Sequence, residues 1–114
     1  MKLPNANRAI VDEDKLVKYL LNQAHPDNGG KAHFFALLGF GESNWQALAD
    51  TLKAVATSNS VVDETETEHG TKYVIDGDIA GPAGVSRIVR TLWIVDRGKQ
   101  DPRLVTAYPS ERTA

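Results

Sequence analysis

The sequence predicts an α+β fold in which about three N-terminal helices pack on one face of a four-stranded antiparallel meander sheet. Before residue 60, apolar residues recur mainly at helical spacing, whereas after it they occur in β-branched and aromatic runs. Short turns rich in glycine, proline and charged residues separate these runs. Because helices come first and strands afterwards, the two kinds of element form separate layers, as is typical of α+β proteins.

Composition limits the chain to one modest core. Its 114 residues are 41% apolar, which suits a single domain, expected over residues 1–109, with residues 110–114 as a frayed tail. The absence of cysteine excludes disulfides and thiol catalysis and fits a reducing compartment. Apolar runs stay below the roughly 18 residues that a membrane span requires, and the first ten residues lack the apolar stretch of a signal peptide. We therefore expect a cytoplasmic protein.

Three helices are expected in the first half of the chain. The first runs over about 13–22, where acidic residues precede the apolar pattern of Leu16, Tyr19 and Leu20 at i, i+3 and i+4. The second is the run KAHFFALL, which stops at Gly39, a favourable C-terminal cap. Ser43 and Gln46 form a capping-box pattern at the start of the third helix. Its apolar stripe consists of Trp45, Leu48, Ala49, Leu52, Val55 and Ala56.

Four strands are expected in the second half. TETEHGTKYVI predicts a hairpin about His69 and Gly70, and SRIVRTLWIVD has the composition and length of a strand. GPAG and RGKQDP are the turns on either side of it. The last strand is RLVTAYP, closed by Pro109, which cannot donate a hydrogen bond to a continuing ladder.

Charge is unevenly distributed along these strands, although the net charge is only −2. Residues 60–80 are mainly acidic, whereas residues 84–104 are mainly basic. Neighbouring antiparallel strands can pair such charges across the ladder, which is the simpler interpretation. The alternative is a basic face that binds an anion.

Three blocks of the sequence together resemble a bacterial family of small domains of unknown function. The blocks are KLVKYLLNQAHPDNGGKAHFFALLGF, the pair of arginines ahead of TLWIV, and PRLVTAYP, and the resemblance covers about residues 1–109. Members of that family are found both as standalone proteins and as the C-terminal tips of polymorphic, contact-dependent toxins. The expected element order is also similar to that of the barnase, EndoU, colicin and RelE superfamily of metal-independent ribonucleases. Since fold alone does not imply function, candidate residues must be chosen by their chemistry.

Metal-free RNA cleavage through the 2′-hydroxyl requires a general base, a general acid and groups that stabilise the charge on the phosphorane. The stretch AHPDNGGKAHFF supplies His25, whose imidazole titrates near neutral pH, and Lys31, a cation at a helix start where backbone N–H groups also favour an anion. Alternatively, His25 caps the first helix and Lys31 is merely solvated. This stretch is therefore a turn between helices and a candidate catalytic segment.

The strand SRIVRTLWIVD contributes further candidates. Alternation puts Arg87, Thr91 and Trp93 on one face and Arg90 on the other with three apolar residues, so we expect the face of Arg90 to be the one that packs on the helices. Arg90 then either pairs with an acid such as Asp76 or Asp78 or clamps a phosphate. Arg87 and Thr91 are candidates for binding an RNA backbone, and Trp93 either stacks on a base or belongs to the core.

In the last strand, Thr106 and Tyr108 share a face and are candidates to donate to a phosphate or to position the attacking hydroxyl, although the same alternation fits an ordinary strand. Of the other histidines, His33 is interpreted as structural and His69 as a solvent-exposed hairpin residue. No metal site and no cofactor are expected, because the three histidines lack ligand spacing and no cysteines assist them.

Two functions follow as hypotheses. The first is a toxin-type, metal-independent ribonuclease that acts on RNA, with His25 as general acid or base, Lys31 and Arg90 as phosphate stabilisers, and Thr106 and Tyr108 in support. The second is a non-enzymatic interaction module, catalytically silent or bound to an immunity- or antitoxin-like protein. The acidic net charge favours the second, because proteins that hold a polyanion are commonly basic.

Overall fold

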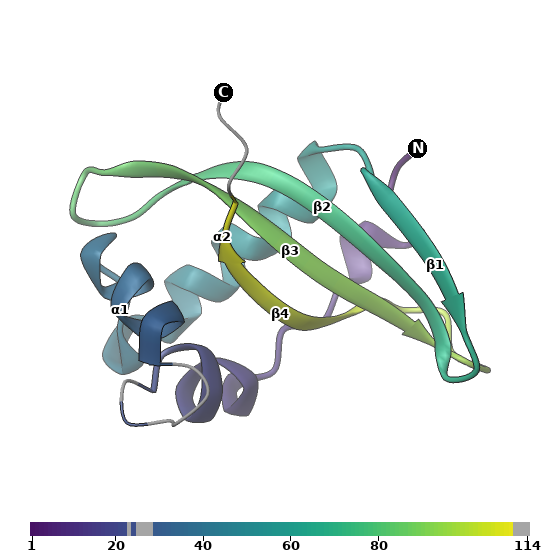
Figure 1. Cartoon of the computed structure of the whole chain (residues 1–114), viewed down its shortest axis with the longest axis horizontal. Coiled ribbons are helices and arrows are strands. Elements are labelled where there is room, and N and C mark those ends of the chain that lie inside the picture. Colours follow the sequence, from purple (N-terminus) through teal and green to yellow (C-terminus); the bar gives the residue numbers. More distant parts are fainter. Residues whose placement is uncertain (23, 25–28, 111–114) are drawn as a thin grey trace.

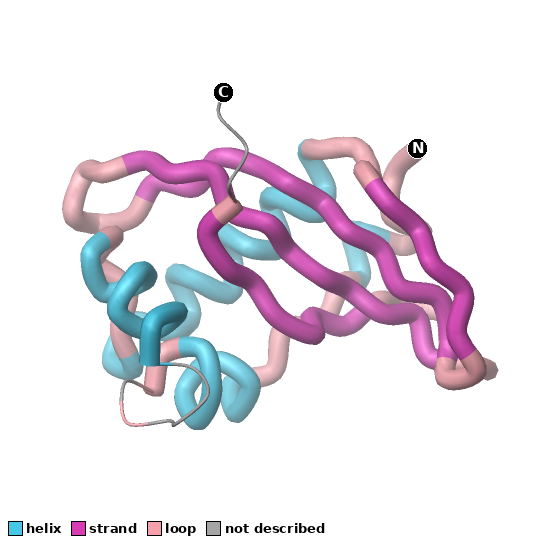
Figure 2. The backbone as a smooth tube through the Cα atoms, in the orientation of Figure 1, coloured by secondary structure: helices cyan, strands magenta, loops and turns pink. Residues whose placement is uncertain are grey.

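The protein is an α+β domain with a helical layer and a sheet layer, as predicted. A computed structural model describes residues 1–22, 24 and 29–110. Helices gather on one side of a four-stranded sheet, whose other face is toward the viewer in Figures 1 and 2. The helical elements are η1 (Ala6–Arg8), η2 (Lys15–Leu20), α1 (Gly29–Leu37), η3 (Glu42–Asn44) and α2 (Trp45–Ser58). The strands are β1 (Asp63–Thr67), β2 (Gly70–Ala80), β3 (Ser86–Asp96) and β4 (Arg103–Pro109).

The sheet is an antiparallel meander in the order β1-β2-β3-β4. The predicted hairpin about His69 and Gly70, the two turns around β3 and the last strand are all confirmed. The register places Arg90 opposite Asp76 on one side and opposite Tyr108 on the other. Since residues directly opposite one another point to the same face, these three side chains form a row across the sheet.

The first helix is shorter and wider than predicted. Residues 13–20 are helical, but Lys15–Leu20 form a π-helical segment, in which the N–H of Leu21 donates to the carbonyl of Leu16 at 2.7 Å. Leu16 and Leu20 are buried against the core, and Tyr19 lies between them and solvent, half-buried. Most of the turn that follows, including His25, lies outside the described residues.

The next two helices differ from prediction only at their ends. Gly39 follows α1 with a φ of 97°, a conformation that suits a glycine C-terminal cap. The apolar stripe of α2 is confirmed, with Trp45 half-buried at its start. The predicted capping box of Ser43 and Gln46 is wrong, because the helix is preceded by the η3 turn. Asn44 holds that turn instead: its side chain accepts from the N–H of Gly41 at 2.7 Å and donates to the carbonyl of Gly39 at 3.0 Å.

The predicted orientation of β3 is wrong. Val89, Thr91 and Trp93 face the helices and are fully buried, whereas Arg90 lies on the open face of the sheet. Counting apolar residues misled the prediction, because the core requires volume and satisfied polar groups more than a larger number of apolar positions. The hydroxyl of Thr91 satisfies this requirement by donating to the carbonyl of Ile75 at 2.7 Å and accepting from the Trp93 indole at 2.8 Å.

The β2–β3 loop fixes the end of α1. The N–H of Ala83 donates to the carbonyl of Leu38 at 3.1 Å, and Gly81 passes so close to that carbonyl that a Cβ there would overlap it. This packing secures α1 beside β4, as Figure 1 shows. At the other end of the chain, the N–H of Ser110 donates to the carbonyl of Ile88, so this residue of the predicted frayed tail is bonded, and residues 111–114 lie outside the description. Across the described part of the chain, no helix has the length and hydrophobicity needed to cross a membrane.

Candidate functional site

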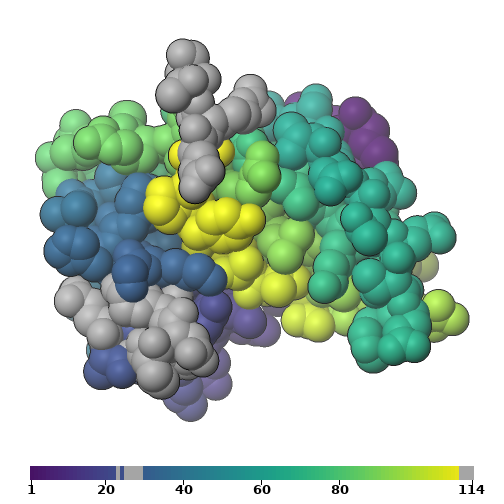
Figure 3. All heavy atoms as spheres, in the orientation of Figure 1, coloured from purple at the N-terminus to yellow at the C-terminus, as the bar shows by residue number. Residues whose placement is uncertain are grey.

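Lys31 is the centre of a polar cluster where η2, α1 and β4 meet. Its ammonium donates to the hydroxyl of Tyr19 at 2.9 Å and to the hydroxyl of Thr106 at 3.1 Å. It also lies 5.1 Å from the ring centroid of Tyr19 and 5.7 Å from that of Tyr108. In the space-filling view, blue atoms of α1 lie directly against yellow atoms of β4 (Figure 3). We call Tyr19, Lys31, Thr106 and Tyr108 the lysine cluster.

The positive charge of Lys31 has no counter-anion among the described residues. The ion pairs of the described residues join other groups, and the partners of Lys31 are two neutral hydroxyls and two aromatic rings. The hydrogen bond from Lys31 lowers the pKa of the Tyr19 phenol below 10, against the opposing effect of burial. The cluster thus combines a half-buried cation with a phenol whose ionisation that cation favours.

Arg90 adjoins the lysine cluster through Tyr108, its neighbour across the β3–β4 ladder. Its guanidinium makes a bidentate pair with Asp76, with N–O distances of 2.8 and 2.9 Å. Hydrogen bonding to Asp76, followed by smaller effects that include Tyr108, raises the pKa of Arg90 above its ordinary value. The simpler interpretation of Arg90, pairing with an acid across the ladder, is therefore confirmed. Since the Arg90 side chain is 38% exposed and uses two of its donors on Asp76, it still has donors for a ligand.

The structure brings together four of the five predicted catalytic residues. Lys31, Thr106 and Tyr108 belong to the lysine cluster, and Arg90 adjoins it. The fifth, His25, lies outside the described residues.

The predicted substrate-binding residues do not lie together. Thr91 and Trp93 are completely buried in the core, so they cannot contact RNA in this fold, and the alternative of a core tryptophan is confirmed. Arg87 is exposed at the start of β3. His33 and His69 are also exposed, His69 beside Glu68 at 3.5 Å.

Tyr19 is the residue that sequence reasoning missed. It was assigned to the apolar pattern of the first helix, because its spacing from Leu16 matches a buried stripe. The sequence feature that could have identified it is the amphipathic character of tyrosine. At the edge of an apolar stripe, a tyrosine packs its ring on the core and directs its hydroxyl toward a polar group.

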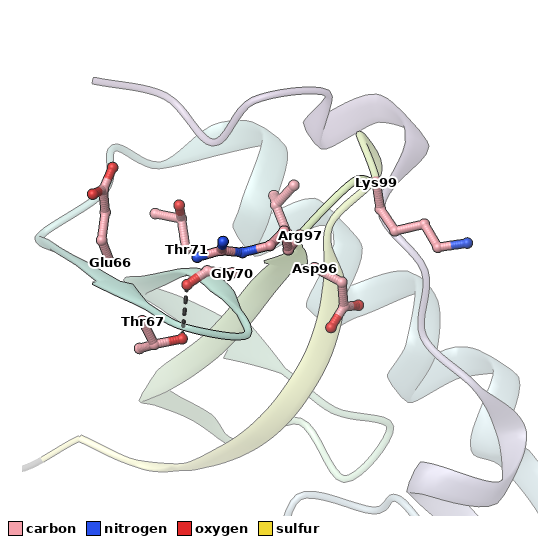
Figure 4. A pocket seen from close by; sticks show the side chains of 8 residues that line it. Glu66, Thr67, Gly70, Thr71, Asp96, Arg97 and Lys99 are labelled. Carbon is pink, nitrogen blue, oxygen red and sulfur yellow. Dashed lines mark hydrogen bonds between the residues drawn. The ribbon is translucent and has the colours of Figure 1, made fainter.

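Away from the lysine cluster, a pocket of about 290 Å³ lies around the β1–β2 hairpin, at the opposite end of the sheet (Figure 4). Glu66 and Lys99 extend away from one another there, and Asp96 is engaged by Arg103 at 2.7 Å. Its charged groups therefore do not converge on one point. Among the described residues, no group of three or more potential ligands is placed to hold a metal ion.

The fold and the lysine cluster define a small α+β domain with a cationic site at the junction of helices and sheet. Residues 2–111 match the model of the family described as a domain of unknown function, DUF6883, so the chain belongs to that family. No curated protein matches the sequence significantly.

A solved structure shares the fold. It is a chain of the contact-dependent growth inhibition toxin and immunity protein complex from Klebsiella pneumoniae 342. The TM-score is 0.71 at 18% identity, and the match covers 89% of this chain and 99% of that chain. At this identity the similarity establishes the shared fold.

Proposed function

We propose that the protein is a metal-independent ribonuclease and that the lysine cluster is its active site. The observation that carries this proposal is the half-buried ammonium of Lys31, which is held by hydroxyls and aromatic rings without a carboxylate among the described residues. Such a cation is available to an anionic ligand, and burial strengthens its attraction to a phosphate. A phosphodiester bound there would also accept hydrogen bonds from the hydroxyls that surround the ammonium.

The proposed reaction is transesterification within the RNA strand. A base takes the proton of a 2′-hydroxyl, the 2′-oxygen attacks the adjacent phosphorus, and the bond from phosphorus to the 5′-oxygen breaks. Tyr19 donates its proton to the departing 5′-oxygen, and Lys31 stabilises the phenolate that forms, consistent with the lowered pKa of this phenol. The products are a 2′,3′-cyclic phosphate and a 5′-hydroxyl.

The remaining groups act on the phosphate. Lys31 offsets the developing charge on the phosphorane, and the hydroxyls of Thr106 and Tyr108 orient the phosphate oxygens. Arg90 is held by Asp76 and lies opposite Tyr108 across the β3–β4 ladder. It binds an adjoining phosphate through the donors that it does not use on Asp76. The role of His25 as the base remains a prediction from the sequence.

The comparison with the Klebsiella structure supports this proposal, because the matched chain has the same fold and belongs to a complex that contains a contact-dependent growth inhibition toxin. Because that complex joins a toxin to an immunity protein, the comparison also supports the alternative function, an interaction module that binds an immunity- or antitoxin-like protein. One observation favours the alternative: β1 is an edge strand whose exposed residues include Asp63, Glu64 and Glu66, a surface that repels RNA and suits a basic partner.

The test is cleavage of total RNA and tRNA in EDTA by the wild type, Lys31→Gln and Lys99→Gln. Both variants remove one positive charge, but Lys99 is exposed at the far end of the sheet. We expect cleavage by the wild type and Lys99→Gln, and a loss of at least a hundredfold in Lys31→Gln with an unchanged melting temperature. A wild type that cleaves no RNA at high concentration, or a Lys31→Gln variant that is fully active, would overturn the proposal.

A further inference from the structure

A pocket of about 330 Å³ lies at the end of β4, where it is lined by residues of α1, β2, β3 and β4. Phe34 of α1 and Pro109 of β4 form part of its wall, together with Ile88 of β3. Asp78 of β2 and Arg87 of β3 supply its charged groups. Side chains from both faces of β3 line the pocket, where the pairing of β4 with β3 ends at Pro109.

The register fixes the distance of this pocket from the proposed catalytic groups. Asp78 and Ile88 are opposite one another, two residues along from the row that contains Asp76 and Arg90. At about 3.4 Å per residue, the two rows are about 7 Å apart. On the helical side, Phe34 follows Lys31 by about one turn, so it lies on the neighbouring position of the same helix face. Tyr108 of the lysine cluster is opposite Arg90, so a phosphate bound by Tyr108 and Arg90 has this pocket within about one nucleotide of it.

The chemistry of the pocket suits a flat group that donates hydrogen bonds. Asp78 is exposed, and its carboxylate has no hydrogen bond or ion pair within the described part of the chain. A carboxylate accepts hydrogen bonds only and repels a phosphate, so the pocket is not a second phosphate site. The Phe34 ring and the Ile88 side chain, both half-buried, offer apolar surface on which a ring can stack. A nucleobase meets both requirements.

The combination of Asp78 and Arg87 selects among the four bases. Guanine presents two adjacent donors, its N1–H and its exocyclic amine, to a carboxylate, and two acceptors, O6 and N7, to a guanidinium. Adenine and cytosine offer a carboxylate one amine beside an acceptor, and uracil offers one N–H between two carbonyls. Arg87 spends one nitrogen on the neighbouring carbonyl of Ser86, at 2.8 Å, and has further donors.

We propose that this pocket is a guanine-preferring base subsite, formed by Asp78, Arg87 and the apolar wall of Phe34 and Ile88. The inference rests on the proposed ribonuclease function, since it assigns the pocket to the nucleotide next to the cleaved phosphodiester. Asp78 accepts from the Watson–Crick edge of the base, and Arg87 donates to O6 and N7.

The first test measures binding, independently of cleavage. Guanosine, adenosine, cytidine and uridine 3′,5′-bisphosphates are titrated into the wild type, Asp78→Asn and Asp63→Asn, with nuclear magnetic resonance as the readout. The bisphosphates carry a phosphate on both sides of the base, so the strand direction does not decide the result. Asp63 is the matched control, because it is an exposed carboxylate on the distant strand β1.

We expect the guanosine compound to bind about tenfold more tightly than the others to the wild type and to Asp63→Asn. In Asp78→Asn this preference falls to about twofold or less. Equal binding of the four compounds to the wild type, or an intact preference in Asp78→Asn, would overturn the base subsite.

Cleavage of four RNAs that each contain a single variable base separates this inference from the proposed function. RNA cleavage without a guanine preference rejects the subsite and leaves the ribonuclease in place. A guanine preference in binding without cleavage of any RNA supports the subsite as a nucleotide pocket and rejects the ribonuclease.

Discussion

Replacing Arg90 by methionine should destabilise the domain through Asp76, whose side chain is only 3% exposed. The change removes two hydrogen bonds of 2.8 and 2.9 Å from a buried carboxylate. Removing one partner of a fully buried pair costs about 3–5 kcal/mol. Because the Arg90 side chain is 38% exposed, solvent replaces part of its interaction, and we expect a loss of about 2 kcal/mol in the free energy of unfolding.

Urea denaturation at pH 7 of the wild type, Arg90→Met, Asp76→Asn and the double variant measures this effect. A loss of this size corresponds to a fall of about 8 °C in melting temperature for a domain of this length. The double variant should recover at least half of the loss, because no buried charge remains in it. If Arg90→Met costs less than about 0.5 kcal/mol, or if the two changes are simply additive, the buried pair does not have the role that its geometry indicates.

Three further predictions concern the core, the loop that secures α1, and the proposed acid. Thr91→Val removes a fully buried hydroxyl that accepts from an indole, and should lower the free energy of unfolding by about 1–3 kcal/mol in urea denaturation; no loss would contradict the assignment of this hydrogen bond. Gly81→Ala should cost about 1–3 kcal/mol, because the new methyl group overlaps the carbonyl of Leu38, whereas Gly30→Ala, with open space at its Cβ, should not destabilise the fold. In a pH–rate profile, cleavage should fall as Tyr19 deprotonates, at a pH below 10, and Tyr19→Phe should cleave about a hundredfold more slowly without this alkaline limb; an unchanged limb would exclude Tyr19 as the acid.

Local chemistry made most of the fold predictable. The hairpin, the two turns around β3 and the end of β4 depend on glycine, proline and charged residues within a few positions of each turn. The stripe of α2 is similarly local, because its burial follows a repeat along one helix.

The orientation of β3 was not predictable in this way. Both of its faces carry apolar residues, and the choice depends on the volume of Trp93 and on a hydroxyl partner for its indole from Thr91. The start of α2 was also missed, because the η3 turn makes Asn44, rather than Ser43, the residue that precedes the helix.

The candidate site depends on contacts between distant parts of the chain. Lys31 and Thr106 were predicted separately, but their separation of 75 residues gave no sign that they are bonded. Tyr19 joins them only because η2 packs against α1 and β4, which the helical pattern does not specify. The pairing of Arg90 was predicted as an alternative, and the register then selected Asp76 over Asp78.

Analysis of the ends that cleavage leaves tests the proposed ribonuclease reaction most directly. The wild type is incubated in EDTA with an RNA, with the same sequence as DNA, and with the 2′-O-methyl RNA. We expect that only the RNA is cut and that its fragments end in a 2′,3′-cyclic phosphate and a 5′-hydroxyl. Cleavage of the DNA or of the 2′-O-methyl strand, or fragments with 5′-phosphates, would contradict a lysine cluster that acts through the 2′-hydroxyl.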